Sequence, residues 1–143
     1  MIFDHIDNSS QLRAGEAPEG VPGLSELISY YGHMPDFNDC EVLSLLFHNK
    51  EVVIEIDGWE ADPNYEEDDK VVLKRHSLVT FNLRGVSIAR VEEFSQQNRL
   101  NLLYLMRVDQ GFQLILAAAL GLDACFTCEE VEVAFHPADI ALI

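Results

Sequence analysis

The sequence predicts an α+β domain, built mostly of antiparallel sheet with one short helix near its N-terminus. One stretch has helical spacing of apolar residues, several later stretches have strand spacing, and no repeated alternation of strand and helix indicates a parallel sheet. At 143 residues the chain is long enough to bury a core without disulfides or a structural metal. We expect a flexible N-terminal arm over residues 1–23, rich in Gly, Pro, Asn and Ser, followed by a single domain over residues 24–143.

The helix is predicted from "LSELISYYG", which begins at residue 24. Leu24, Leu27, Ile28 and Tyr31 recur at the spacing of one face of a helix, and Gly32 is placed as a C-terminal stop. The pattern therefore predicts a short amphipathic helix.

A β-hairpin is predicted directly after it, because apolar residues alternate along two neighbouring stretches. The first stretch has Leu43, Leu45 and Phe47 on one face, and the second has Val52, Ile54 and Ile56. The turn between them is expected near Asn49 and Lys50.

The second half of the chain is predicted to be mostly strands. The stretches with strand character are residues 78–83, 100–108, 112–119 and 123–137, the last holding one or two strands.

Two further segments give no strand period. Residues 60–69, "EADPNYEEDD", predict a polar loop, and residues 90–98 predict a helical or loop segment.

The charge is strongly negative and unevenly distributed. The chain has 25 Asp and Glu against 9 Lys and Arg, a formal net charge of −16. Residues 1–69 hold 17 acids and 2 bases, whereas residues 70–143 hold 8 acids and 7 bases. Nucleic acid and anionic membranes should repel such a chain, so we expect neither as a partner.

The sequence also argues against several locations and cofactors. No apolar run approaches the roughly 18 to 20 residues that span a bilayer, and the first residues lack a secretory signal pattern, so we expect a cytoplasmic protein. No phosphate-binding Gly-rich loop and no G-x-S-x-G motif occurs. We therefore expect no cofactor.

The stretch "GHMPDFNDCE", residues 32–41, is the candidate for chemistry. His33, Asp36, Asp39 and Glu41 are residue types that serve as acid and base or as metal ligands in a cleft. However, "PDFND" is also a plausible turn in which Asp and Asn side chains bind nearby backbone N–H groups. We favour the structural turn, and we assign no catalytic residue and no metal ligand.

The three cysteines give weak signals. Cys125 and Cys128 have the spacing of redox and zinc motifs, but they lie in a predicted strand beside two glutamates. A structural zinc needs four ligands, and Cys40 is the remaining cysteine, so a histidine such as His48, His76 or His136 would have to complete the set. Redox and zinc roles are therefore disfavoured.

"YYGHMPDFNDCEVLSLLF" resembles the opening signature of the immunity protein 50 family, small bacterial proteins linked to polymorphic toxin systems. The matching positions are Gly32, Pro35, Phe37, Asp39, Glu41 and Val42. Residues 94–98 and 121–135 also resemble the family's second half, so the resemblance covers about residues 24–136. Asn38 departs from the pattern, which has His there, and an amide cannot replace His as a base or a zinc ligand.

The resemblance implies a protein that binds and neutralises a cognate toxin domain, and the acidic first half supplies an independent physical reason. Toxins that attack nucleic acid, such as a basic nuclease, carry positive surfaces that an acidic inhibitor can meet rapidly. The alternative is a metal-dependent or acid/base enzyme that uses the residues of the 32–41 stretch. The candidate contact residues for the toxin are Asp57, Trp59, Glu60, Asp62, Tyr65, Glu66, Glu67, Asp68 and Asp69. A solvated loop is the other interpretation of this run.

Overall fold

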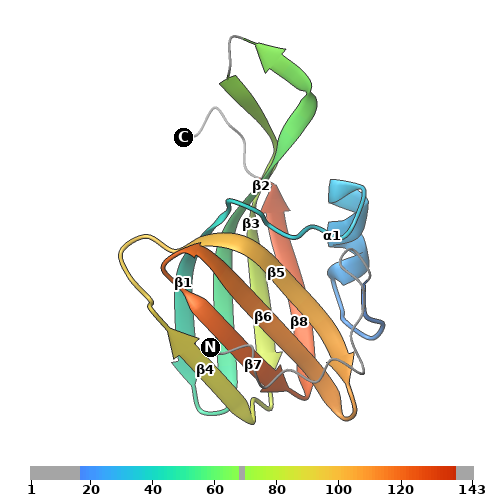
Figure 1. Cartoon of the computed structure of the whole chain (residues 1–143). Helices are drawn as coiled ribbons and strands as arrows, with labels where there is room; N and C mark the ends of the chain where they lie inside the picture. Colours follow the sequence, from blue (N-terminus) through green and yellow to red (C-terminus); the bar gives the residue numbers. More distant parts are fainter. Residues whose placement is uncertain (1–16, 68–69, 138–143) are drawn as a thin grey trace.

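The computed structural model describes residues 17–67 and 70–137, with residues 62–67 and 70–74 described by their backbone alone. Its elements are one helix, α1 (Leu24–Tyr31), and the strands β1 (Glu41–His48), β2 (Glu51–Glu67), β3 (Lys70–Arg84), β4 (Ile88–Glu92), β5 (Arg99–Val108), β6 (Gly111–Leu120), β7 (Asp123–Cys128) and β8 (Glu130–Pro137). The strands form one 8-stranded sheet in the order β4-β7-β6-β5-β1-β2-β3-β8 (Figure 1). Each pair is antiparallel. The predicted antiparallel sheet with a short N-terminal helix is confirmed, although the described chain is dominated by sheet.

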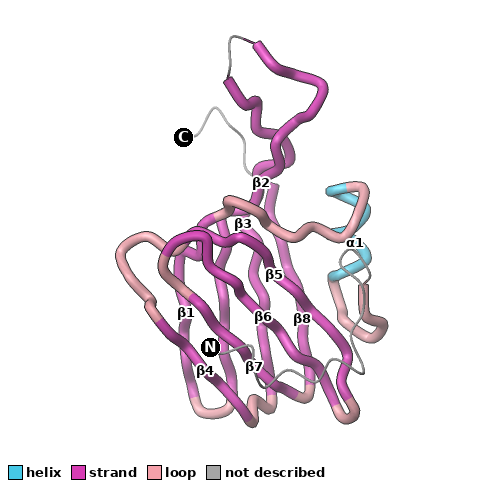
Figure 2. The backbone as a smooth tube through the Cα atoms, viewed as in Figure 1, coloured by secondary structure: helices cyan, strands magenta, loops and turns pink. Residues whose placement is uncertain are grey.

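The sheet folds over on itself into two facing layers. Figures 1 and 2 show β4, β7, β6 and β5 in one layer, with β1, β2, β3 and β8 behind it. The layers are joined where β5 meets β1, at the single pair Glu41 and Arg99. Fully buried residues from both layers, such as Leu114 of β6 and Phe81 of β3, belong to one core cluster between them. The hydrophobic core therefore lies between two halves of the same sheet.

Helix α1 packs against this core through Leu24, Leu27 and Tyr31, which are buried. It ends at Gly32, whose φ of 85° is in the left-handed region that glycine enters without steric cost. Both the predicted helix and its predicted stop are confirmed. Among the described residues, no helix is long and apolar enough to cross a membrane.

The chain just before α1 is attached to the sheet. The backbone N–H of Val133 donates to the carbonyl oxygen of Pro22 at 2.8 Å, and Arg107 Nη1 donates to the carbonyl oxygen of Glu19 at 3.2 Å. Residues 17–23, placed by the sequence in a flexible arm, thus contact β8 and β5. Residues 1–16 of the predicted arm lie outside the described part of the chain.

The predicted hairpin is confirmed as β1 and β2, with Asn49 and Lys50 between them. The predicted side-chain direction is wrong at one position of β1, because the pairing register with β2 shifts between Val42 and Ser44. This bulge leaves Leu43 49% exposed instead of on the inner face.

The predicted polar loop over residues 60–69 is wrong for residues 60–67, because β2 continues to Glu67, and β3 begins at Lys70. Residues 68 and 69 of this prediction lie outside the described part of the chain. These extensions of β2 and β3 form a two-stranded ribbon that projects beyond the two layers (Figure 1). This ribbon is called the arm from here on and is distinct from the predicted N-terminal arm. The register is irregular between Ala61 and Glu66, and Pro63, which has no N–H to donate, lies in that interval. Backbone hydrogen bonds between two strands can form such a ribbon without alternating apolar residues. The sequence prediction relied on that alternation, so it did not detect these strands.

The helical or loop prediction for residues 90–98 is wrong at its start. Residues 90–92 belong to β4, which pairs with β7, and only residues 93–98 lie outside a strand. Glu93 has a φ of 60°, a left-handed conformation that ends the strand. The predicted strands at 78–83, 100–108, 112–119 and 123–137 are confirmed within β3, β5, β6 and the β7–β8 pair.

Candidate functional site

The candidate site lies at the root of the arm, where β2 leaves the two layers. Gly58 is required there, because a Cβ at this position would lie 2.7 Å from Tyr31 Oη and 3.2 Å from the Phe37 ring. The Tyr31 hydroxyl is also 3.0 Å from Ser77 Oγ, so the two buried hydroxyls share a hydrogen bond. Helix α1 and the strands β2 and β3 therefore meet at this point, and position 58 has no space for a side chain larger than that of glycine.

The stretch between α1 and β1 forms the structural turn that the sequence predicts. Asp36 Oδ1 accepts the backbone N–H of Asn38 at 3.0 Å, which is an Asx turn. The N–H of Asp39 donates to the Leu100 carbonyl oxygen at 2.8 Å, and the N–H of Leu100 donates back to the Cys40 carbonyl oxygen at 2.8 Å. This turn is thus fastened to β5 by backbone hydrogen bonds.

Two residues of this turn adopt left-handed conformations. Asp39 has a φ of 65°, which Asp tolerates, and Phe37 has a φ of 56°, which is rare for an aromatic residue. The Phe37 side chain is nonetheless fully buried, with edge-to-face contacts to Tyr31 and Phe81 at centroid distances of 5.9 and 6.1 Å. Burial of this ring compensates for the backbone conformation and fixes the turn beside β2.

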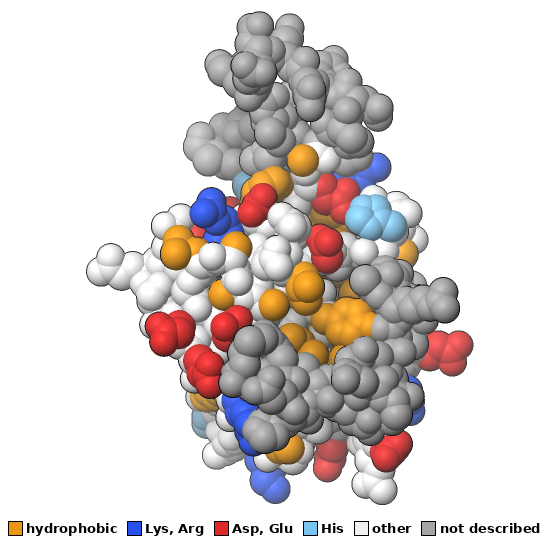
Figure 3. All heavy atoms as spheres, viewed as in Figure 1, with side chains coloured by type: hydrophobic (Ala, Val, Ile, Leu, Met, Phe, Trp, Pro, Cys, Tyr) orange, Lys and Arg blue, Asp and Glu red, His pale blue; other side chains and the backbone are white. Residues whose placement is uncertain are grey.

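A surface hollow of about 410 Å³ joins this turn to the root of the arm. Its lining residues are His33, Asp36, Phe37, Asn38, Asp39, Trp59, Glu60 and Ala61. The hollow therefore combines residues from the two sites that the sequence presents as alternatives. Figure 3 shows acidic side chains and a histidine exposed on the face just below the arm.

One ion pair links the two sides of the hollow directly. His33 Nε2 lies 2.5 Å from Glu60 Oε1, and His33 Nδ1 lies 3.1 Å from the Met34 carbonyl oxygen. Glu41, the fourth candidate of the stretch, does not line the hollow, since it begins β1 and pairs with Asp57 and Arg99. The predicted cluster is therefore brought together only in part.

A second histidine and carboxylate pair lies near Gly58. His76 Nε2 contacts Asp57 Oδ1, and the His76 carbonyl oxygen accepts the hydroxyl of Tyr30 at 3.3 Å. The sequence offered His76 only as a possible zinc ligand and missed its pairing with Asp57, because that pairing depends on the register between β2 and β3, which no local pattern specifies.

Trp59 contributes both to the core and to the hollow. Its backbone N–H donates to Cys40 Sγ at 3.3 Å, and the Cys40 thiol donates to the Trp59 carbonyl oxygen at 3.3 Å. The indole is partly buried against the main core and also lines the hollow. Trp59, which the sequence selects as a contact residue, thus lines the hollow and also packs on the core.

The remaining candidate contact residues follow Glu60 in the sequence. Asp62, Tyr65, Glu66 and Glu67 lie in β2, where the backbone alone is described, and Asp68 and Asp69 lie outside the described residues. Their assignment as contact residues stays a prediction.

Cys125 and Cys128 point to opposite faces of β7, because they are three residues apart in a strand. Cys128 belongs to the main core, whereas Cys125 packs with Met106 and Ile115 on the other face of the sheet. Their spacing therefore does not bring the two sulfurs to one site. Among the side chains that the structure describes, no group of three or more His, Cys, Asp or Glu is arranged to hold a metal ion.

Burial makes the thiols difficult to ionise, which gives a prediction for alkaline pH. Burial raises the pKa of Cys40 to about 12 and that of Cys128 to about 11. The unfolded chain loses these protons near pH 8.5, so this contribution to stability is complete below about pH 8.5 and falls as the pH rises toward 11 to 12. We expect the midpoint of urea unfolding to decrease between about pH 8.5 and 10.5. An unchanged midpoint over that interval would contradict the burial of these thiols.

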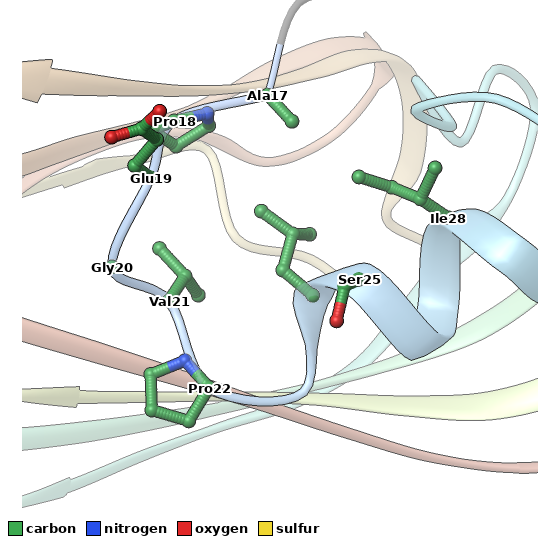
Figure 4. Close-up of a pocket in the computed structure, with 9 residues that line it drawn as sticks. Ala17, Pro18, Glu19, Gly20, Val21, Pro22, Ser25 and Ile28 are labelled. Carbon is green, nitrogen blue, oxygen red and sulfur yellow. The ribbon is translucent and has the colours of Figure 1, made fainter.

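A second hollow, of about 520 Å³, lies beside α1 (Figure 4). Its lining is Ala17, Pro18, Glu19, Gly20, Val21, Pro22, Leu24, Ser25 and Ile28. Glu19 is the single titratable side chain in this lining, so the hollow offers no acid and base pair.

The fold and the hollow at the root of the arm together define a small antiparallel β-protein with a carboxylate-lined surface beside a projecting hairpin. No protein-family model, curated protein or solved structure matches the chain. The resemblance to the immunity protein 50 family stays a prediction that rests on the quoted motifs.

Proposed function

We propose that the protein is an immunity-type protein, which binds a cognate bacterial toxin domain and neutralises it through the acidic surface at the root of the arm. The observation that carries the proposal is the hollow that Asp36, Asp39 and Glu60 line together with the partly buried Trp59. Carboxylates attract basic side chains, and an indole beside them can bind a guanidinium or ammonium group through its ring face.

The electrostatics of the chain support a basic partner. The net charge of −16 is concentrated in the half of the sequence that contains the hollow and the arm. Arg75, a basic residue at the root of the arm, uses its Nε to donate to the Tyr30 carbonyl oxygen. A basic nuclease would be drawn to such a surface, and an inhibitor that covers its substrate channel needs no chemical step.

The geometry gives less support to the acid/base or metal-dependent enzyme. Asp36 already holds the Asx turn, and Glu41 does not line the hollow. His33 faces Glu60, a residue that the enzyme hypothesis did not include. These three assignments favour a binding surface at the same place.

Co-expression tests the proposal. The toxin domain should be encoded in a neighbouring reading frame, and its expression should arrest growth unless this chain is co-expressed. We expect growth to be restored, with an equimolar complex recovered from the cells. Failure of both rescue and complex formation with that domain would contradict the proposal.

Replacing Trp59 with Ala should weaken the complex mainly by raising the dissociation rate, by about tenfold or more, if the ring anchors the partner. Because the ring also packs on the core, the free energy of unfolding should fall as well. Surface-binding kinetics and thermal melting on the same variant separate the two effects. A dissociation rate equal to that of the wild type would assign Trp59 to the core alone.

A further inference from the structure

Strand β4 is a terminal strand of the described sheet, since β7 is its one neighbour in the strand order. All five of its residues are exposed, and they include two aliphatic side chains, Ile88 at 48% and Val91 at 37%. An edge strand presents backbone N–H and C=O groups that can pair with another strand, and apolar side chains on such an edge favour association. The question is which strand fits this edge.

The charges of β4 identify a complementary strand. Arg90 and Glu92 are two residues apart, so their side chains lie on the same face of the strand. In the part of the chain that the structure describes, neither takes part in an ion pair. Across the ladder to β7, Glu92 is opposite Asp123, a residue of the same sign, and Arg90 is opposite Cys125. Neither charge therefore has an opposite charge across the ladder to β7.

We propose that β4 pairs with β4 of a second copy of this chain, in an antiparallel arrangement with its two-fold axis at Val91. In an antiparallel pair, directly opposite residues point to the same face, so a symmetric pair must be centred on a residue and not between two residues. An axis at Ala89 would place Arg90 opposite Ile88 of the other copy. An axis at Arg90 would place the two Arg90 side chains opposite each other. Centring on Val91 places each Arg90 opposite the Glu92 of the other copy, which forms two equivalent ion pairs.

The apolar surroundings fit the same register. Val91 meets its own copy at the axis, on the face of β4 that includes Ala89. Ala89 is opposite Phe126, and the ring of Phe126 lies 6.3 Å from that of Phe47, centroid to centroid. Phe47 is 52% exposed beside this edge, so a second copy would cover apolar surface together with the strand.

The association should be weak and should respond to salt in a characteristic way. A five-residue edge buries less than the roughly 800 Å² per partner of a standard interface, so we expect a reversible dimer with a dissociation constant in the micromolar range. Two chains of net charge −16 repel each other at long range, and salt screens that repulsion. Dimer formation should therefore strengthen at moderate salt, which is opposite to the response expected for binding a basic toxin.

Sedimentation equilibrium of the full chain tests the register with charge reversals. The wild type should reach twice the monomer mass of 16.1 kDa. Arg90→Glu and Glu92→Arg should each raise the dissociation constant about tenfold or more, since each places like charges opposite one another. Lys70→Glu, which changes the net charge as Arg90→Glu does but lies in the arm that projects beyond the two layers, should dimerise as the wild type does (Figure 1).

The decisive measurement is an equal mixture of the two single variants. Chains with Arg90→Glu and chains with Glu92→Arg should form a heterodimer, because each charge of one chain then meets an opposite charge of the other. The double variant should also recover wild-type dimerisation. A wild type that stays monomeric up to roughly 1 mM, or a mixture that does not associate more strongly than either variant alone, would overturn the proposal.

Discussion

Replacing Glu66, Glu67, Asp68 and Asp69 with their amides should slow association with the cognate toxin domain about tenfold or more. The four acids follow Glu60 and Ala61 of the hollow in the sequence, and no Lys or Arg occurs between residues 57 and 69. If this charge attracts a basic partner, the association rate should also fall with salt, as the Debye length shrinks from about 10 Å at 0.1 M to about 3 Å at 1 M ionic strength. Surface-binding kinetics at two salt concentrations measures both effects.

A matched control removes the same number of charges at the other end of the molecule, near the β5–β6 and β7–β8 turns (Figure 1). Its substituted residues are Glu19, Asp109, Glu129 and Glu130. We expect this control to change the association rate less than the arm variant does, because its charges are farther from the proposed contact. Association that is independent of salt and equal in both variants would mean that the acidic arm is only a solvated surface.

Gly58→Ala should lower the free energy of unfolding by about 1 to 3 kcal/mol, through overpacking at the root of the arm. The added methyl group would lie 2.7 Å from Tyr31 Oη and 3.1 Å from Val79 Cγ2, closer than unstrained contacts allow. Urea unfolding of the purified variant measures the change.

A double variant shows whether this cost comes from the contact with Tyr31. Tyr31→Phe removes the hydroxyl that the new methyl group would contact, so the double variant Gly58→Ala with Tyr31→Phe should lose less stability than the sum of the two single variants. Additive losses would show that the steric conflict lies elsewhere.

Local periodicity predicted the elements whose side chains face the core. The spacing of Leu24, Leu27 and Tyr31 corresponds to the buried face of α1, and the alternation of Val52, Ile54 and Ile56 corresponds to the inner face of β2. These patterns exist because each element must bury one face.

The arm and β4 have no such pattern, and both were missed as strands. Each is held by backbone pairing with a distant segment, β2 with β3 in the arm and β4 with β7, and a backbone ladder does not require a particular side-chain period. The bulge at Leu43 was also unpredictable, since it depends on the register with β2.

The candidate site was predicted in its parts and not in its arrangement. The sequence selected His33 and Asp36 in one hypothesis and Trp59 and Glu60 in another, and the structure joins them in a single hollow. The pairing of His33 with Glu60 brings together two residues that are distant in the sequence. It follows from the turn fastened to β5, which no local sequence signal specifies.

Backbone hydrogen exchange of the chain, free and in complex with its cognate toxin domain, tests most directly whether the root of the arm is the contact surface. We predict slower exchange in the complex over residues 33–39 and 57–61, together with the arm strands that follow. The β5–β6 and β7–β8 turns at the far end of the molecule should exchange at the same rate in both states. Protection confined to those turns, with the root of the arm unchanged, would contradict the account.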